Sequence, residues 1–167
     1  MPRRSALIVP VPEAEPAVGG LRLAHDPSAT MGVPAHVTIL FPFAPPGEVG
    51  EDAVADLVGR FPAFDFVLDR IGRFEDGEGA VWLHPEPSAP FVDLTAAVAQ
   101  RWPEYPPYDG SFDGPIPHLT VSMGPIDLEV ALPIPCRARV VVLIEESEED
   151  GRWHERRVFP LRDQGVA

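Results

Sequence analysis

The sequence contains no lysine, and all thirteen of its basic residues are arginine. Against 26 acidic residues, this gives a formal net charge of −13. Proteins that bind long duplexes neutralise many phosphates with basic side chains, whereas this surface as a whole repels polyanions. We therefore expect a small nucleotide or an RNA 3′ end as the ligand, and no long duplex nucleic acid. An arginine-lined cleft remains compatible with this charge, because net charge does not describe a single pocket.

Cysteine and long apolar runs are also scarce. Cys136 is the single cysteine, so the chain forms no intramolecular disulfide, which suits a reducing compartment. The apolar run at 6–9 meets Pro10 and is shorter than the roughly 7–15 apolar residues of a signal peptide. No segment approaches the roughly 18 apolar residues of a membrane span. These absences predict a soluble, cytoplasmic protein with no membrane partner.

Length and composition fit one domain over residues 1–167, since hydrophobic residues make up 45% of the chain. Apolar spacing predicts helices over 15–24, 49–61 and 89–102. Alternating or β-branched runs predict strands over 5–11, 35–41, 64–74, 80–84 and 118–123, and a final hairpin formed by 133–145 and 151–161. Segments rich in proline and glycine predict loops at 25–34 and 102–117.

The two halves of this order repeat each other. Each runs from a strand through a proline-rich segment, a helix and a loop to a tetrapeptide of the form His–apolar–Thr–apolar. The tetrapeptides are HVTI at 36–39 and HLTV at 118–121, and a proline-containing approach precedes each. The repeat predicts two structurally similar lobes, each contributing one strand to a common site. The alternative is chance similarity in a chain that has 22 prolines.

The tetrapeptides carry the residues that we expect to do chemistry. Side chains alternate between the faces of a strand, so His36 and Thr38 share one face, and His118, Thr120 and Ser122 share another. An imidazole, with a pKa of roughly 6.5, serves as acid or base near neutral pH, and a hydroxyl donates a hydrogen bond to a phosphoryl oxygen. Two such pairs would hold a phosphate between them. A purely structural role suits one buried histidine better than two copies of the whole pattern.

These motifs resemble the 2H phosphoesterase superfamily, whose members carry two H-x-(T/S)-apolar motifs on two lobes. PAHVTILFPF and PIPHLTVS are similar to the bacterial 2′-5′ RNA ligase family, and the similarity extends from ALIVPVP to RWHERRVFPL. The resemblance implies an α+β, bilobal fold with two antiparallel sheets around a central cleft and helices outside. It also implies metal-independent chemistry on 2′,3′-cyclic phosphates or 2′-5′ phosphodiesters, without a cofactor. His36 and His118 match the catalytic histidines, Thr38 and Thr120 match the phosphate-binding hydroxyls, and which histidine is the acid stays open.

Tyr105 and Tyr108 precede the second motif and are further candidates for substrate binding. Their rings could stack on a nucleobase, although aromatic residues between prolines also pack locally. Arginines 152, 156 and 157 could hold a phosphate, but we favour pairing with the acidic turn at 145–150. Strand alternation predicts 152, 154 and 156 on one face of the hairpin and 153, 155 and 157 on the other.

The remaining histidines, His25, His84 and His154, are expected to be structural or exposed. None has the spacing of a metal ligand set, so we predict no metal site. Cys136 is expected to be a strand residue rather than a nucleophile.

Together these features predict a monomeric cyclic phosphodiesterase that hydrolyses a nucleotide or RNA end by two-histidine acid–base catalysis. The alternative is a nucleotide- or RNA-end-binding module without hydrolytic activity, and a purely structural protein would leave both motifs unexplained. The sequence has no G-x-x-x-x-G-K-[ST] loop and no lysine, which disfavours ATP-dependent ligation through a P-loop or a lysyl-adenylate.

Overall fold

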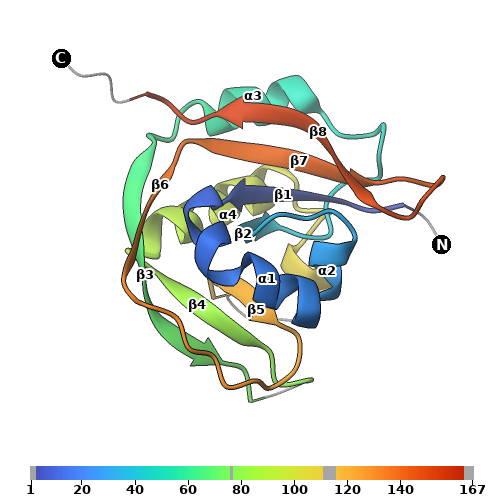
Figure 1. The fold of residues 1–167 in the computed structure, drawn as a ribbon. Helices are drawn as coiled ribbons and strands as arrows, with labels where there is room; N and C mark the ends of the chain where they lie inside the picture. The colour runs from blue at the N-terminus through green and yellow to red at the C-terminus, as the bar shows by residue number, and fades with distance from the viewer. Residues whose placement is uncertain (1–2, 76, 111–115, 164–167) are drawn as a thin grey trace.

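The computed structural model describes residues 3–75, 77–110 and 116–163, which form two four-stranded antiparallel sheets and four α-helices (Figure 1). The first sheet has the order β2-β1-β7-β8 and consists of β1 (Ser5–Pro10), β2 (His36–Leu40), β7 (Val140–Glu146) and β8 (Trp153–Pro160). The second has the order β5-β4-β3-β6 and consists of β3 (Phe64–Arg73), β4 (Val81–Glu86), β5 (Leu119–Ser122) and β6 (Ile134–Ala138). The helices are α1 (Glu15–His25), α2 (Pro27–Thr30), α3 (Glu51–Val58) and α4 (Ala89–Arg101), with 3₁₀ turns η1 (Pro12–Ala14) and η2 (Pro107–Gly110). This confirms the predicted α+β, bilobal architecture.

The repeat in the sequence corresponds to a repeat in the topology. Each tetrapeptide forms an edge strand that pairs antiparallel with the strand preceding it, β2 with β1 and β5 with β4. The two edge strands lie beside each other, and the helices cross between lobes, because α1 packs on β5 and α4 packs on β2. Two hydrogen bonds hold these crossings: Thr95 Oγ1 donates to the Ile39 carbonyl, and the Met123 N–H donates to the His25 carbonyl.

One large core lies between the two sheets and the helices, and it explains which face of each strand is free. Val37 and Ile39 of β2, and Leu119 and Val121 of β5, point into this core. On the other face of the first sheet is a smaller apolar cluster made by Ala6, Ile8, Val33, Val142 and Ile144. Strand alternation therefore leaves the tetrapeptide histidines and threonines outside the main core.

The predicted final hairpin is wrong in its first strand. Residues 133–145 divide at Arg139, so that β6 pairs with β3 in the second sheet while β7 pairs with β1 and β8 in the first. The break lets one stretch of chain supply a strand to each sheet. The predicted loop at 25–34 contains the short helix α2, which the Asp26 side chain caps by accepting a hydrogen bond from the Ser28 N–H.

The predicted alternation on β8 is wrong for Arg157. A register shift in β7–β8 places Glu155 opposite Ile144 but Arg157 opposite Leu143. Ile144 and Leu143 are neighbours on β7 and point to opposite faces, so Glu155 and Arg157 do too. Among the residues described, no helix is long and apolar enough to span a membrane.

Candidate active site

His36 and His118 have the same local geometry in the two lobes. The Nδ1 of His36 lies 2.8 Å from the Pro34 carbonyl oxygen, and the Nδ1 of His118 lies 2.6 Å from the Ile116 carbonyl oxygen. A carbonyl oxygen only accepts hydrogen bonds, so in each ring Nδ1 carries the proton and donates it. In the neutral imidazole the lone pair then lies on Nε2. Each ring is thereby prepared to accept a proton at Nε2.

The protein environment favours the neutral form of both rings. Burial lowers the pKa of His36 to about 4; the hydrogen bond to Pro34 and the Asp26 carboxylate oppose this effect, and the positive charge of Arg22 adds to it, as does His118 when it is protonated. Burial also lowers the pKa of His118, again opposed by the bond to its carbonyl partner. β2 and β5 are in contact where the two lobes meet, and the charge of His118 is the smallest of the causes that lower the pKa of His36.

Aromatic rings form the surroundings of His118. Its ring lies edge-on to Phe74, with centroids 5.0 Å apart, and to Trp82, with centroids 5.9 Å apart. The Trp82 indole lies directly over Gly72, where a Cβ atom would come within 2.4 Å of the indole ring. This close approach requires glycine at position 72. It allows the Trp82 indole to lie against β3 while its ring contacts His118.

Thr38 and Tyr108 are brought together from different parts of the chain. Their side chains are hydrogen-bonded to each other, and the Tyr108 N–H donates to the Phe41 carbonyl at 2.6 Å. Tyr108 and Asp109 both have left-handed backbone conformations, with φ of 51° and 54°. Non-glycine residues adopt this conformation only where the surroundings impose it. The turn η2 thus places a phenol next to the first tetrapeptide, and the substrate-binding role of Tyr108 stays a prediction.

The other candidate residues have different surroundings. Thr120 is half-buried opposite Trp82, and its hydroxyl has no hydrogen-bond partner in the described part of the chain, so it is available to a ligand. Ser122 is buried, and its hydroxyl donates to the Gly124 carbonyl. The Tyr105 ring packs edge-on against Phe43 with centroids 5.6 Å apart. Ser122 and Tyr105 therefore have local partners, whereas the Thr120 hydroxyl has none among the described residues.

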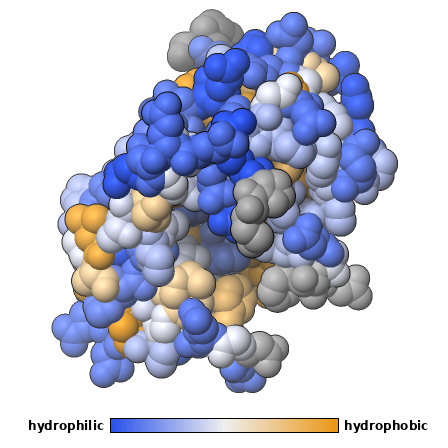
Figure 2. Space-filling view, turned by 90° about the vertical axis from the view of Figure 1, so that its right-hand side faces the viewer, coloured by the Kyte–Doolittle hydropathy of each residue, from blue (hydrophilic) through white to orange (hydrophobic). Residues whose placement is uncertain are grey.

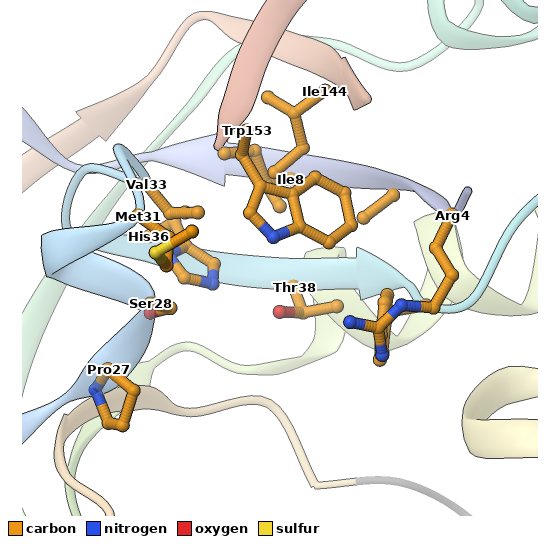
Figure 3. A pocket seen from close by; sticks show the side chains of 12 residues that line it. Arg4, Ile8, Pro27, Ser28, Met31, Val33, His36, Thr38, Ile144 and Trp153 are labelled. Atoms are coloured by element: carbon orange, nitrogen blue, oxygen red, sulfur yellow. The ribbon is translucent and has the colours of Figure 1, made fainter. Parts of the chain in front are cut away.

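A pocket of about 330 Å³ adjoins the first tetrapeptide (Figure 3). His36 and Thr38 lie along β2 on one side, with Pro27 and Ser28 of α2 near His36. Trp153 of β8 closes the opposite side (Figure 3). The remaining lining residues are Arg4, Ala6, Ile8, Met31, Val33, Phe41 and Ile144. The pocket is thus polar at His36 and Thr38 and mainly apolar or aromatic beyond them.

Arg4 is a pocket residue that the sequence analysis did not identify. Its guanidinium lies 5.2 Å from the centroid of Phe41 and 5.9 Å from that of Trp153. It pairs with both carboxylate oxygens of Glu146, at 2.7 and 3.1 Å, and the pKa of Arg4 is raised by this hydrogen bonding. Trp153 was also not predicted to line the pocket. It lies 115 residues from Thr38 along the chain, so the sequence does not indicate that the two are close in the fold.

Arg22 is a second residue that was missed, and it supports the loop before His36. It is only 2% exposed, donates to the Val33 carbonyl at 3.0 Å, and pairs with Asp26 at 3.2 Å. It also donates to the Ser28 hydroxyl. The sequence signal that could have identified Arg22 is its position on the apolar face of the helix predicted over 15–24. This network fixes the segment between α1 and β2 and adds positive charge near His36.

The C-terminal arginines form ion pairs that partly differ from those predicted. Arg156 pairs with Glu51 at 3.2 Å and with Glu145 at 3.8 Å, and Arg157 pairs with Asp52 at 3.1 Å. Most of these bonds therefore reach α3 rather than the acidic turn. Arg152 donates to the Thr30 carbonyl and so holds the hairpin to α2.

The surface is hollowed on the side where the β7–β8 hairpin ends. Figure 2 shows this side, with hydrophilic residues over most of the upper half and a group of apolar residues along the lower margin of the hollow. Ile144 and Trp153 of this hairpin line the pocket beside His36. The outer His154 pairs with Asp150 at 3.3 Å, and His25 is exposed at the end of α1.

Comparisons with known proteins agree with this arrangement. No curated protein sequence matches the chain significantly. Among solved structures, E. coli LigT complexed with NADP+ is 20% identical, with a TM-score of 0.69 over 96% of this chain and 98% of that one. E. coli LigT complexed with 3′-AMP is 19% identical, with a TM-score of 0.68 over 96% and 99% of the two chains. TT0787 of Thermus thermophilus is 20% identical, with a TM-score of 0.61 over 97% and 100%.

The family comparison covers most of the chain. Residues 10–157 match the profile of the 2′-5′ RNA ligase superfamily, and this range contains both tetrapeptides, the pocket residue Trp153 and seven of the eight strands in full or in large part. The two sheets, the paired edge strands and this match lead to one conclusion: the chain belongs to the 2′-5′ RNA ligase superfamily, the 2H phosphoesterases.

Proposed function

We propose that this protein is a metal-independent phosphodiesterase that hydrolyses a nucleoside 2′,3′-cyclic phosphate or a 2′-5′ phosphodiester. The observation that carries the proposal is the matched pair of imidazoles, each donating from Nδ1 to a carbonyl two residues earlier in the chain. A hydrogen bond that fixes Nδ1–H in both rings leaves Nε2 for proton transfer in both. A module that only bound nucleotides would not need this arrangement twice.

The proposed step is an in-line displacement at phosphorus. One imidazole takes a proton from water through Nε2 while the water oxygen bonds to phosphorus, and the bond from phosphorus to a ribose oxygen breaks. That ribose oxygen takes a proton from the other imidazole, which enters the step protonated. The products are a phosphomonoester and a free ribose hydroxyl. Thr38 and Thr120 donate hydrogen bonds to the phosphoryl oxygens.

The pocket beside His36 supports a nucleotide as the substrate. Phe41 and Trp153 offer aromatic surfaces, and Ile8 and Ile144 offer apolar surface, next to the phosphate-binding residues. Aromatic side chains stack on nucleobases, so a base can enter this pocket while the phosphate lies between the histidines. The solved complexes of E. coli LigT with NADP+ and 3′-AMP contain ligands of the same chemical class.

A substrate panel tests the proposal. Purified protein, incubated with EDTA, is assayed with the four nucleoside 2′,3′-cyclic phosphates and with 2′-5′ dinucleotides. Because imidazoles transfer the protons and hydroxyls bind the phosphate, we expect turnover to persist in EDTA. Activity that disappears with chelator and returns with a divalent ion would indicate metal-assisted hydrolysis instead. Binding of 3′-AMP without turnover of any substrate would leave the binding module as the function.

A further inference from the structure

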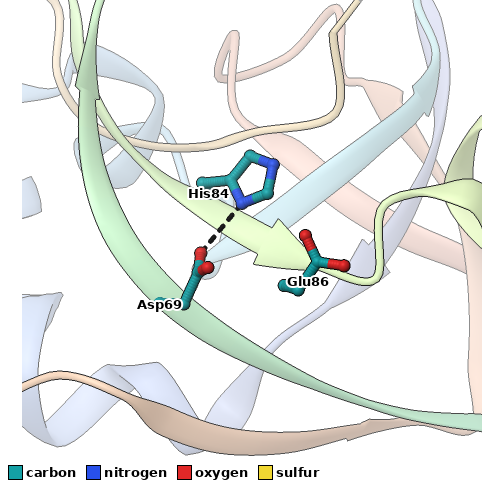
Figure 4. A group of neighbouring side chains, drawn as sticks. All are labelled: Asp69, His84 and Glu86. Atoms are coloured by element: carbon teal, nitrogen blue, oxygen red, sulfur yellow. Dashed lines mark hydrogen bonds and ion pairs between the residues drawn. The ribbon is translucent and has the colours of Figure 1, made fainter.

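The second sheet carries a compact group of ligating side chains that the two-histidine mechanism does not use. Asp69 lies on β3, and His84 and Glu86 lie on β4. His84 Nδ1 lies 2.8 Å from Asp69 Oδ1, and one ligating atom from each of the three residues lies within 4.8 Å of the others. Figure 4 shows the carboxylates of Asp69 and Glu86 near the His84 ring, one from each strand.

A β-bulge brings Asp69 into this group. Leu68 pairs with Pro85, and Arg70 pairs with His84, so Asp69 is an extra residue in β3. A bulge of this kind lets two consecutive residues oppose one residue of the partner strand, and bulges commonly re-aim a side chain near functional sites. Asp69 and Arg70 thus both lie opposite His84, and the Asp69 carboxylate reaches the ring.

The two carboxylates are not neutralised by arginine. In the described ranges, neither Asp69 nor Glu86 forms an ion pair with an arginine, and the contact between Asp69 and His84 is the one polar pairing in the group. His84 is only 7% exposed, so water reaches this side of the group poorly. A cation bound here would receive one ligand atom from each of the three side chains.

We propose that Asp69, His84 and Glu86 bind one divalent transition-metal ion of the Zn²⁺ type. Zinc bonds to imidazole nitrogen and carboxylate oxygen at roughly 2.0–2.2 Å, so tetrahedral ligand atoms lie about 3.4 Å apart. The separations here, from 2.8 Å to no more than 4.8 Å, bracket that value. The imidazole ligand favours Zn²⁺ over Mg²⁺ and Ca²⁺, which prefer oxygen ligands alone. The ion takes the place of the proton between Nδ1 and Oδ1, and water completes its coordination.

This site is separate from the candidate active site, although the two are close. In the antiparallel pairing of β4 with β5, Trp82 lies opposite Thr120 and Leu83 lies opposite Leu119. Extended by one residue, the same register places His84 opposite His118. Neighbours opposite each other on one face of a sheet lie about 5 Å apart at Cβ. Of the three ligands, Asp69 lies on β3, on the side of β4 away from β5, whereas Glu86 lies on β4 two residues beyond His84. The proposed hydrolysis assigns no step to this ion, and its binding is measured without an activity assay.

Cobalt provides a direct test, since Co²⁺ bound by nitrogen and oxygen in a tetrahedral site absorbs visible light. Protein freed of metal with chelator is titrated with Co²⁺, and Zn²⁺ is then added to displace it. We expect one equivalent of Co²⁺ with tetrahedral absorption, and displacement by Zn²⁺. Replacement of Glu86 by glutamine, E86Q, removes one of three protein ligands and should weaken binding by more than about tenfold. His84→Asn should abolish it.

Two controls make the outcome specific. His154→Asn alters an exposed His–Asp pair that has no third ligand among the residues described, and it should bind Co²⁺ like the parent. The double variant His36→Ala/His118→Ala keeps all three proposed ligands and should bind Co²⁺ like the parent. Loss of binding in this variant would show that the two histidines hold the metal, and it would overturn the proposal. Equal affinity in E86Q and parent, or no tetrahedral absorption in the parent, also overturns it. Glu86 is exposed, so E86Q decides the matter even if His84→Asn fails to fold.

Discussion

At the scale of the residue, a backbone carbonyl two residues before each histidine determines which ring nitrogen carries the proton. The carbonyls of Pro34 and Ile116 hold Nδ1–H in both rings, and burial lowers both histidine pKa values. Near neutral pH the empty site therefore holds two neutral imidazoles. One of them must gain a proton before it can act as an acid. A bound anionic substrate favours this protonation, because a nearby negative charge raises the pKa of an imidazole.

Substitution of either histidine should remove proton transfer at one end of the displacement. We expect His36→Ala and His118→Ala each to lower kcat about 10²–10⁴-fold. The double variant should be little worse than either single variant, because residues that act as a unit are not additive. Thr38→Ala and Thr120→Ala remove a hydrogen bond to a charged oxygen and should cost about 1.5–3 kcal/mol in kcat/KM. Near-parental turnover in a histidine variant, with His154→Ala as the control, would show that histidine to be structural.

Ligand binding should be coupled to proton uptake. A phosphate bound between two neutral imidazoles raises their pKa values, so the complex should take up close to one proton at pH 7. Calorimetric titration with 3′-AMP in two buffers of different ionisation enthalpy measures this number directly. Uptake should fall in the His36→Ala variant. Equal heats in both buffers would show that the histidines already carry their final protonation state in the free protein.

At the scale of the element, β8 contributes to the pocket through Trp153. Truncation of this ring should weaken binding of the base and leave the phosphate site in place. We expect Trp153→Ala to raise KM for a nucleoside cyclic phosphate about tenfold, since stacking on an aromatic ring contributes about 1–3 kcal/mol per base. A cyclic phosphate without a base should be hydrolysed at the same kcat/KM by variant and parent. An equal loss on both substrates would mean that Trp153 supports the fold rather than the base.

Strand β3 depends on a glycine beside Trp82. A Cβ atom at position 72 would come within 2.4 Å of the indole, so Gly72→Ala should shift Trp82 and lower the free energy of unfolding by about 1–3 kcal/mol. Because Trp82 contacts His118, activity should fall as well. Gly20→Ala is the matched control: position 20 lies in α1 with no atom within 4 Å of the added carbon, and alanine there should stabilise the protein by about 1 kcal/mol. Denaturant unfolding of both variants measures the difference.

At the scale of the whole molecule, the half-buried imidazoles make stability depend on pH. His36 has a folded-state pKa of about 4, below its unfolded value of roughly 6.5, so the unfolded chain binds more protons between these values. The contribution of His36 to stability is complete above about pH 6.5 and is lost as the pH falls toward 4. His118 acts in the same direction.

Unfolding measured at pH 7.5, 6, 5 and 4.5 checks this expectation. The parent should lose stability steadily over this range, and His36→Ala should lose less because the titrating group is absent. The variant of the exposed His154, His154→Ala, is measured in parallel as the control. A pH dependence identical in parent and His36→Ala would contradict the low pKa of this residue.

Local pattern was enough to predict most of the elements and the strand faces of the four proposed catalytic and phosphate-binding residues. The strands and helices have strong periodicity, and His36, Thr38, His118 and Thr120 belong to short repeated motifs, so their faces follow from alternation alone. The pocket was not predictable in the same way. Trp153 meets Thr38 only because β8 pairs with β7 and β7 pairs with β1, and Arg4 meets it because β1 pairs with β2; no local pattern encodes these pairings.

Irregularities in strands explain the remaining errors. The bulge in β7–β8 reverses the face of Arg157, and the bulge in β3 directs Asp69 toward His84. In both places one extra residue changes the partner of every side chain that follows it. The division of 133–145 between two sheets at Arg139 is of the same kind, since a single residue transfers an apolar run from one lobe to the other.

The order in which the strands enter the two sheets has a consequence for synthesis on the ribosome. The sheet that holds His118 is composed of residues 64–138, whereas the sheet that holds His36 needs β7 and β8, which end at residue 160. As the chain emerges from its N-terminus, the second motif can therefore reach its finished sheet before the first one does. The half of the active site that is translated first is the last to be completed.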